Sequence, residues 1–446
     1  NVESRALVRS LYNIGRRMST TMKNETLQKA EAILRKNDRG SYTVPTHGLY
    51  PFQWNWDSCL SAIGFSHIDE DRAWVEIETL FNHQWEDGMV PHIVFHQHDD
   101  GYFPGPSVWQ TGRKVDTSGI TQPPVAGFAV KRIFERSSNP EKIKSRVLEL
   151  LPKIHAWHQW FYRCRDPKGS GLVAIIHPWE SGRDNSNDWD NALARVPTDG
   201  VGSFTRRDTA HADASHRPTQ GQYERYIWLV KAFRQHQWDN TTLHDNSPFQ
   251  MIDPGFNAIL IRSCFDLAEL ADQLGETQMA EESRALGAHA LAALESLWSD
   301  KWGQYLCLDR ISNELVESPS IGGLIPVFTN IPMARAQAIA AKLDELHQLC
   351  SYGIPSHHPL SEDFDSKRYW KGPVWLIINY LIADGLRKYG LTARVERITS
   401  DSIKLIHQSG FAEYYSPLDG EPCGGLDFTW TAAMVFEFIN SFAAEQ

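Results

Sequence analysis

Apolar side chains recur at intervals of three and four residues along much of the chain, which is the period of a helix with one buried face. The pattern predicts helices over 26–37, 57–66, 69–85, 121–137, 139–164, 222–238, 256–275, 277–299, 331–347, 373–389, 391–409 and 430–444. Capping residues support several starts: Asp69 precedes an acidic first turn, and Asn139 is followed by Pro140. The sequence therefore predicts an all-α protein in which helices come in pairs.

The segments between these helices are long and rich in Gly, Pro, Trp and His. They cover about 38–56, 86–120, 165–221, 301–330 and 350–372. Connections of this length in a compact protein are generally functional or disordered, and the aromatic content argues against disorder. A small β-hairpin insertion is expected within 303–328, with its turn at Ser312 and Asn313. Long loops alternating with helix pairs predict a closed ring of paired helices whose loops gather at one end.

No Gly/Pro/Ser-rich linker interrupts the chain, so we expect residues 1–446 to form a single domain, with 1–24 as an N-terminal helical arm. Hydrophobic residues make up 41% of the chain, enough for a large core. The net charge of −11, without a basic stripe, argues against nucleic acid as a partner. No apolar run approaches the ~20 residues that cross a bilayer, so we expect no membrane insertion.

The six cysteines form no CxxC pair, and no His cluster has zinc spacing, so we expect reduced thiols, no metal site and a cytoplasmic location. The aromatic content is more informative. The chain has 16 Trp, 14 Tyr and 20 Phe. Trp in Gly/Pro-rich loops is suited to stacking against sugar rings, because C–H faces pack on π faces.

One acidic segment, 177–186, places Asp184 close to Trp179. In a partly apolar pocket the pKa of this carboxyl would rise, and Asp184 could then remain protonated and act as a general acid. Gly182 would allow the tight turn that such a loop needs. The alternative is an ordinary helix start, with Asp184 or Ser186 as the N-cap.

A second acidic segment, 413–421, contains Glu413, Asp419 and Glu421. One of them is expected to act as the base, because glycoside hydrolysis requires one acid and one carboxylate. Asp419 lies in a turn sequence, and Glu421 is the preferred base because Pro422 and two glycines follow it. Glu413 is the reserve candidate, and spacing alone does not separate the two.

Further polar and aromatic residues have the character of a sugar pocket, although each could equally belong to the core or to the solvated surface. Trp54 and Trp56 are two residues apart, and Asp57 directly follows Trp56. The Asp57 carboxylate could accept hydrogen bonds from two hydroxyls of a sugar. Arg217, six residues before Tyr223, could bind the carboxylate of an acidic aglycone. The complete set of candidate substrate-binding residues is Tyr50, Trp54, Trp56, Asp57, Tyr102, Gln122, Trp179, Glu180, Gly182, Arg217, Tyr223, Trp370, Gly372 and Trp375.

Taken in order, several motifs between about residues 45 and 435 resemble glycoside hydrolase family 63, and within it the bacterial glucosylglycerate and mannosylglycerate hydrolases. These motifs are YPFQWNWD, GMVPHIVF, GYFPGP, TSGITQPP, HPWESGRDNS, SHRPTQGQYERY, YWKGPVW, FAEYYSPLDGEPCG and TWTAA. The resemblance implies an (α/α)6 barrel and an inverting mechanism with Asp184 as acid and Glu421 as base. It also implies a sugar near Tyr50 and Trp56, and a glycerate carboxylate near Arg217 and Tyr223.

The sequence departs from the family pattern beside the expected acid. Arg183 stands where the family commonly has an apolar residue, and Asn187 with Asp188 replaces a Pro-Arg pair. If Asp188 lined the pocket, its negative charge would disfavour an anionic substrate.

Together these features predict an inverting, exo-acting α-glycosidase that cleaves a small-molecule glycoside such as glucosylglycerate or mannosylglycerate. Acid, base and water suffice for this reaction, so we expect no cofactor and no metal. A homo-oligomer is compatible with the sequence. One alternative is an α-glucosidase for glucosylglycerol, a disaccharide or an oligosaccharide end, and the other is a non-catalytic sugar-binding protein.

Overall fold

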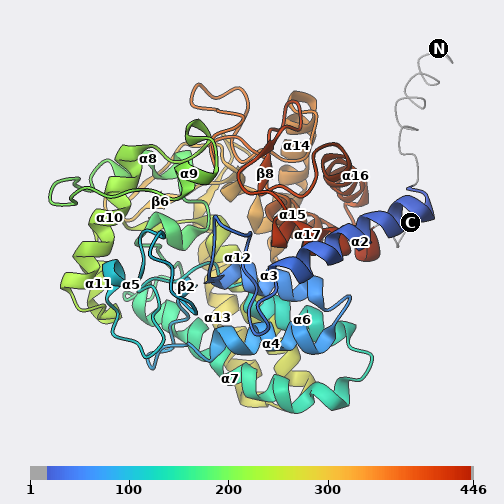
Figure 1. Ribbon diagram of the computed structural model, residues 1–446, viewed down its shortest axis with the longest axis horizontal. Helices are drawn as coiled ribbons and strands as arrows, with labels where there is room; N and C mark the ends of the chain where they lie inside the picture. The colour runs from blue at the N-terminus through green and yellow to red at the C-terminus, as the bar shows by residue number, and fades with distance from the viewer. Residues whose placement is uncertain (1–17, 443–446) are drawn as a thin grey trace.

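The computed structural model describes residues 18–442, and helices dominate it (Figure 1). The α-helices are α2 (Thr20–Asn37), α3 (Asn55–Phe65), α4 (Glu70–Phe81), α5 (Pro106–Trp109), α6 (Ala126–Arg136), α7 (Pro140–Cys164), α8 (Asp190–Leu193), α9 (Asp208–His211), α10 (Gln220–Gln235), α11 (Asn240–Asn246), α12 (Pro254–Gln273), α13 (Thr277–Leu294), α14 (Met333–Leu349), α15 (Leu376–Lys388), α16 (Thr392–Ser409) and α17 (Thr429–Glu437). Short 3-10 helices are η1 (Pro178–Ser181), η2 (Asn187–Trp189), η3 (Ala214–His216), η4 (Glu295–Leu297), η5 (Ile321–Gly323) and η6 (Ile325–Phe328), and a π-helical turn, η7 (Phe438–Phe442), follows α17. The strands are β1 (Gln53–Trp54), β2 (Ile93–Val94), β3 (Met251–Ile252), β4 (Trp298–Ser299), β5 (Gln304–Tyr305), β6 (Leu308–Asp309), β7 (Glu314–Leu315), β8 (Tyr414–Tyr415) and β9 (Pro422–Cys423).

The helices form two concentric rings. In the inner ring α3, α6, α12, η6, α15 and α17 each contact the next, and α17 returns to α3. The outer partners of these six are α4, α7, α13, α14, α16 and α2, respectively. Every residue of α3 and α17 is buried, whereas α2 buries only one face, as expected when a helix surrounded by others is apolar on all sides. The predicted (α/α)6 barrel is confirmed.

The ring closes where the last inner helix meets the first helices of the described chain. Gly64 of α3 lies so close to Ala433 of α17 that a Cβ on the glycine would lie 2.5 Å from the alanine Cβ. Thr429, at the start of α17, donates its hydroxyl to the Val44 carbonyl at 2.7 Å and accepts a hydrogen bond from Asn37 Nδ2 at 2.9 Å. Segments about 390 residues apart in sequence are therefore held side by side.

The predicted elements agree closely with the observed ones, because the buried face of each long helix repeats clearly. Each of the twelve predicted helices is present, with ends shifted by a few residues. One difference lies beside the pocket: the helix predicted from residue 373 begins at Leu376, because Val374 pairs with Tyr415 as an isolated β-bridge. The predicted hairpin is confirmed as β6 and β7, with Leu308 opposite Leu315.

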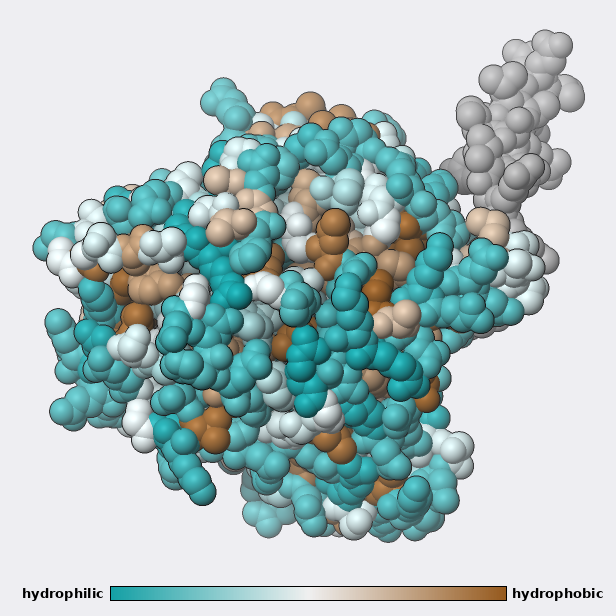
Figure 2. All heavy atoms as spheres, viewed as in Figure 1, coloured by the Kyte–Doolittle hydropathy of each residue, from teal (hydrophilic) through white to brown (hydrophobic). Residues whose placement is uncertain are grey.

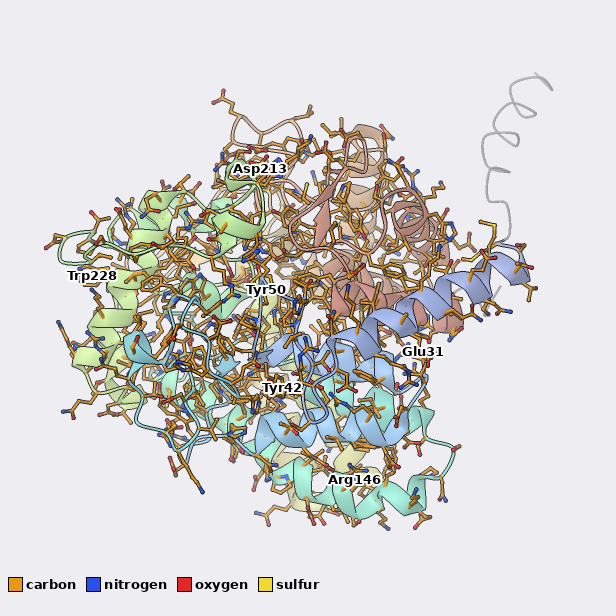
Figure 3. All side chains as sticks on the ribbon, viewed as in Figure 1. Glu31, Tyr42, Tyr50, Arg146, Asp213 and Trp228 are labelled. Atoms are coloured by element: carbon orange, nitrogen blue, oxygen red, sulfur yellow. The ribbon has the colours of Figure 1, made fainter. Side chains whose placement is uncertain are left out.

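The long loops gather at one end of the barrel, as predicted. In Figure 3, Tyr50 lies near the centre of this end, whereas Glu31 on α2 and Arg146 on α7 lie toward the edge of the molecule. Figure 2 shows a mostly hydrophilic surface on the same face, with apolar residues in small separate groups. The loops therefore cover the apolar core, and their polar side chains point toward solvent.

Three further expectations concern the chain as a whole. All six cysteines are buried and unpaired, as predicted. No helix within residues 18–442 is long and apolar enough to cross a membrane. Most of the predicted arm over 1–24 lies outside the described residues, and α2 begins at Thr20. The single-domain organisation stays a prediction.

Ring closure predicts that Gly64→Ala destabilises the protein. The added methyl group would overpack the contact with Ala433, which we expect to lower the free energy of unfolding by about 1–3 kcal/mol. Thermal unfolding of the variant measures this, with Gly221→Ala as the control, because a Cβ there would meet only an arginine side chain at 3.6 Å. Equal melting temperatures for the two variants would contradict the tight α3–α17 contact.

Candidate active site

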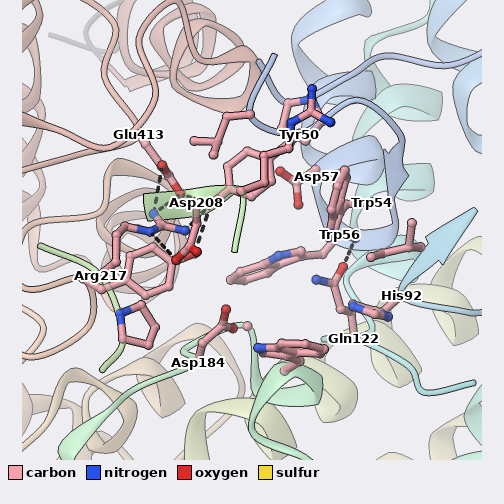
Figure 4. Close-up of a pocket in the computed structure, with 18 of the residues that line it drawn as sticks. Tyr50, Trp54, Trp56, Asp57, His92, Gln122, Asp184, Asp208, Arg217 and Glu413 are labelled. Atoms are coloured by element: carbon pink, nitrogen blue, oxygen red, sulfur yellow. Dashed lines mark hydrogen bonds and ion pairs between the residues drawn. The ribbon is translucent and has the colours of Figure 1, made fainter. Parts of the chain in front are cut away.

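One pocket opens among the gathered loops, and segments from the whole length of the described chain line it (Figure 4). Its lining residues are Pro45, Leu49, Tyr50, Trp54, Trp56, Asp57, His92, Ile93, Tyr102, Phe103, Pro104, Gln122, Trp179, Gly182, Asp184, Arg207, Asp208, Arg217, Pro218, Tyr223, Tyr369, Trp370, Trp375, Glu413, Phe428 and Trp430. Most of the predicted site residues are among them. Four carboxylates and several indole rings thus face one cavity.

Asp184 reaches the pocket from a tight turn that follows η1. Gly182 ends η1 with a φ of 71°, and a Cβ on it would lie 2.5 Å from the Trp56 ring, so both the conformation and the close packing require glycine. Ser186, one of the two alternative caps, accepts the Asp188 N–H at the start of η2. The carboxyl of Asp184 is therefore not the cap of this turn and projects into the pocket, as Figure 4 shows.

The surroundings of Asp184 favour its protonated form. Burial of the carboxyl, together with the negative charges of Glu413 and Asp208, raises the pKa of Asp184 to about 7, although Arg217 opposes the shift. Tyr226 donates its hydroxyl to the Asp184 carbonyl at 3.0 Å and so holds the backbone rather than the carboxyl. A carboxylic acid that keeps its proton near neutral pH can serve as a general acid.

Glu413 has the opposite surroundings. It lies immediately before β8, and its carboxylate accepts hydrogen bonds from Tyr50 Oη at 2.9 Å and from the Gly425 N–H at 2.9 Å. Arg217 Nη1 lies 3.4 Å from both carboxylate oxygens. Donors directed at both oxygens match the acceptor-only, ionised carboxylate. Such a group can accept a proton from water.

Arg217 links this carboxylate to a second one. Its Nε lies 3.3 Å from Asp208 Oδ2, and its Nη2 donates to Tyr50 Oη at 2.6 Å. Arg206 binds Asp208 through two nitrogens, at 3.0 and 2.7 Å. Although burial opposes it, Arg217 and Arg206 hold the pKa of Asp208 below its ordinary value. Figure 4 shows Arg217 and Asp208 between Glu413 and Asp184.

The remaining wall is aromatic, with a few polar groups. Trp370 and Trp375 stack with ring centroids 3.9 Å apart, and Trp56 meets Trp430 edge to face at 5.4 Å. Gln122 Oε1 accepts the Trp56 N–H at 3.1 Å, which fixes the first turn of α3. Burial and the nearby Glu413 raise the pKa of Asp57 well above its ordinary value. Aromatic walls with a few convergent polar groups are typical of saccharide pockets.

Comparison with known proteins identifies this arrangement. The family described as the mannosylglycerate hydrolase MGH1-like glycoside hydrolase domain matches residues 50–431. This chain belongs to that family of glycoside hydrolases. It is 43% identical to mannosylglycerate hydrolase MGH1 of Selaginella moellendorffii over 94% of this chain and 86% of the relative. It is 34% identical to the glucosylglycerate hydrolase of Mycolicibacterium hassiacum over 92% of this chain and 97% of the relative.

A solved structure shares the fold. The family 63 mannosylglycerate hydrolase of Thermus thermophilus, in complex with Tris and D-glycerate, superposes with a TM-score of 0.89 at 42% identity, covering 92% of this chain and 98% of the other. These relatives confirm the predicted family and the class of enzyme, an inverting glycoside hydrolase.

Glu421, the preferred base in the sequence, lies outside the pocket of this glycoside hydrolase. Strands β8 and β9 pair Tyr415 with Pro422, so residues 416–421 form the tip of a hairpin and Glu413 stands at its base. The Glu421 side chain is 47% exposed and forms an ion pair with Lys367. Sequence distance alone gave no information about this register, and the reserve candidate Glu413 is the residue that faces Asp184.

Two predicted substrate-binding residues also lie outside the pocket. Glu180 is buried behind it, where it pairs with Arg165 Nη2 at 2.9 Å and accepts the Ile176 N–H at 2.9 Å. Gly372 donates its N–H to Ser356 Oγ at 3.0 Å, and a Cβ on it would lie 2.3 Å from the Asp365 carbonyl oxygen. Both residues support the pocket wall rather than face a substrate.

Several pocket residues were absent from the sequence prediction. Arg207 and Asp208 stand at the start of the one-turn helix α9, in a polar segment whose composition resembles that of any solvated segment, so no sequence signal separates them from surface charges. Tyr369 and Trp430 stand within motifs that the sequence did highlight, and each could have been found there as an aromatic neighbour of a predicted residue. Within residues 18–442 no cluster of three metal-ligating side chains occurs.

The raised pKa of Asp184 predicts a pH-dependent gain of stability in Asp184→Asn. The folded enzyme binds a proton here between pH 3.8 and about 7 that the unfolded chain releases, so stability falls as pH rises through this window. Asparagine carries no such charge. At pH 8 we expect the variant to gain at most about 4 kcal/mol in the free energy of unfolding, and at pH 4 little or nothing. Chemical denaturation at both pH values measures this; an equal gain at pH 4 and pH 8 would contradict the shift.

Proposed function

We propose that this enzyme hydrolyses mannosylglycerate or glucosylglycerate to the free hexose and glycerate, with Asp184 as general acid and Glu413 as general base. The observation that carries the proposal is the contrast between these two carboxyl groups. Burial and neighbouring negative charges favour the protonated form of Asp184, whereas Glu413 accepts hydrogen bonds from two donors and lies beside an arginine. The names of the relatives support the substrate class.

The chemistry follows from these protonation states. Asp184 donates its proton to the glycosidic oxygen as the bond to the anomeric carbon breaks, and glycerate leaves with that oxygen as a hydroxyl group. Glu413 takes a proton from a water molecule whose oxygen bonds to the anomeric carbon from the opposite face. The configuration at that carbon inverts. Asp184 then takes up a proton from solvent, and Glu413 releases to solvent the proton it gained.

Sugar binding is assigned to the aromatic wall. Trp56, Trp179 and Trp375 offer faces or edges to a hexose ring, and Asp57 is placed at the start of α3 to accept or donate hydrogen bonds to hydroxyl groups. Buried indoles line the pocket, which suits a single terminal hexose. This supports exo action.

The aglycone is assigned to the side of the pocket that carries Arg217 and Tyr223. A guanidinium can bind a glycerate carboxylate through two parallel hydrogen bonds. One observation favours a second candidate, a neutral aglycone such as glycerol: Arg217 already lies between Asp208 and Glu413, so two carboxylates balance its charge. Asp188 does not enter this balance, because it is buried away from the pocket. A cytoplasmic location and homo-oligomerisation stay predictions.

The assignment of the base predicts different outcomes for two glutamates eight residues apart. We expect Glu413→Gln to lower kcat on mannosylglycerate by at least about 100-fold, since the amide cannot accept a proton. Glu421→Gln is the matched control and should keep wild-type activity, because its side chain pairs with Lys367 at the surface. Hexose release measures both. Loss of activity in the control, or full activity in Glu413→Gln, would overturn the assignment.

The two aglycone candidates predict different responses to Arg217→Ala. Because Arg217 also contacts Glu413, the variant should lose activity on every substrate. If Arg217 also binds the glycerate carboxylate, the variant loses more activity on the charged substrate: we expect kcat/KM for mannosylglycerate to fall about 10-fold further than for mannosylglycerol. Steady-state kinetics on the two substrates measure the ratio. If the ratio of the two kcat/KM values is the same as in the wild type, Arg217 contacts only the base Glu413 and the neutral aglycone is favoured.

A further inference from the structure

The backbone of the loop that carries Asp184 is held at several residues, including Asp184, whose carbonyl accepts the Tyr226 hydroxyl at 3.0 Å. Asn185 Oδ1 accepts the Trp370 N–H at 2.9 Å, and Ser186 caps η2. The Arg183 carbonyl accepts Trp189 Nε1–H at 2.8 Å. The carboxyl of Asp184 is therefore the one acidic group of this turn directed at the pocket, on a backbone that has little freedom to move.

The guanidinium of Arg183 lies behind this loop, away from the pocket, and is 2% exposed. Its Nη1 lies 3.1 Å from Asp188 Oδ2 and its Nη2 lies 3.0 Å from Asp253 Oδ1. Asp253 caps α12, an inner helix of the barrel, and Asp188 belongs to η2. The arginine thus ties the loop of the acid to the frame of the barrel through two buried carboxylates.

Close packing confines this guanidinium. The Trp189 ring lies on one side, with its centroid 5.0 Å from Arg183 Cζ. Gly322 lies on the other, where a Cβ would come within 2.3 Å of Arg183 Nη2. Ser320, just before η5, donates its hydroxyl to Asp188 and accepts from Arg183 Nη1 at 3.4 Å. The segment before η5 therefore joins the loop of the acid and the start of α12 as the third part of this cluster.

Three buried charges are an expensive way to stabilise a loop, because their desolvation offsets most of their attraction and apolar residues of similar volume often stabilise as well or better. Although burial opposes it, Arg183 holds the pKa of Asp188 below its ordinary value, whereas burial raises the pKa of Asp253. The arrangement fixes the direction of the guanidinium: Nη1 donates hydrogen bonds to Ser186, Asp188 and Ser320, and Nη2 forms an ion pair with Asp253.

On the basis of the proposed function, we propose that Arg183 is a positioning residue for the general acid. Its guanidinium, held between Asp188 and Asp253, fixes the adjacent Asp184 so that the carboxyl meets the glycosidic oxygen. Arg183 touches neither the substrate nor the reacting atoms. A displacement of about 1 Å at a reacting group can cost on the order of 100-fold in rate, so a rigid attachment here matters for turnover.

The test uses two substrates that differ in their need for an acid. Mannosylglycerate has a poor leaving group that must be protonated, whereas α-mannosyl fluoride releases fluoride with little assistance. We expect Arg183→Met to lower kcat on mannosylglycerate by about 10–100-fold and kcat on the fluoride by less than about 3-fold, with KM nearly unchanged. Arg183→Lys, which keeps one buried positive charge, should recover part of the loss.

The matched control is Arg262→Met, which removes another buried arginine between two carboxylates. Arg262 is 5% exposed, lies 2.8 Å from Asp266 and 3.0 Å from Asp384, and does not line the pocket. Its loss should lower the melting temperature without changing the ratio of the two activities. Equal losses on both substrates in folded Arg183→Met, or no loss on either, would overturn the positioning role.

Two further variants separate the possible failures. If Arg183→Met does not fold, Asp188→Asn is the substitute, because it removes the ion pair with Arg183 while keeping a side chain of the same size. An unchanged ratio of the two activities in Asp188→Asn also overturns the positioning role of Arg183. Asp184→Ala tests the underlying assignment: it should lose mannosylglycerate cleavage and retain fluoride cleavage. If Asp184→Ala affects both substrates equally, the proposed general acid is wrong, independently of Arg183.

Discussion

Closure of the helical ring is the constraint on which the rest of the molecule depends. α17 must pack against both α3 and α2, and the contact of Gly64 with Ala433 leaves no space for a larger residue. The pocket lies over this junction. Tyr50 and Asp57 come from the chain before and within α3, whereas Glu413 comes from the segment that leads into α17 and Trp430 from α17 itself. The hydrogen bond from Tyr50 to Glu413 exists only because the ring closes.

Charge compensation explains how four carboxylates share one pocket. Arg217 lies against Glu413 and Asp208, and Arg206 binds Asp208 a second time, so these two acids are stabilised as anions. No cation forms an ion pair with Asp184 among the described residues, and burial of its carboxyl, together with the charges of Glu413 and Asp208, raises its pKa although Arg217 opposes the shift. The two catalytic carboxyls thus differ in their surroundings rather than in residue type: Asp184 is buried without an ion pair, whereas Arg217 and two hydrogen-bond donors lie against Glu413.

The fold could be predicted from the sequence because long helices repeat their buried face many times, and most pocket residues could be predicted because Trp, Gly and acids cluster in the loops. Glu413 could not be chosen over Glu421, since the choice depends on which residues pair in a hairpin of two-residue strands. Glu180 has the sequence context of a site residue, but a partner fifteen residues away, Arg165, holds it in the core. Asp208 begins a one-turn helix in a polar segment without periodicity, and only its ion pairs with Arg206 and Arg217 reveal its place in the pocket.

The packing of α2 on α17 also has a consequence for how the protein is made. A ribosome releases the chain from its N-terminus, and domains begin to fold as they emerge. Here α2 and the side of α3 that packs on α17 remain uncovered until α17, which begins more than 370 residues after α3 begins, has been synthesised. The intermediate helix pairs can assemble earlier, but the barrel remains an open arc during that time. Synthesis of this enzyme therefore exposes its earliest helices for longest, and chaperone binding during translation would matter most at its N-terminal end.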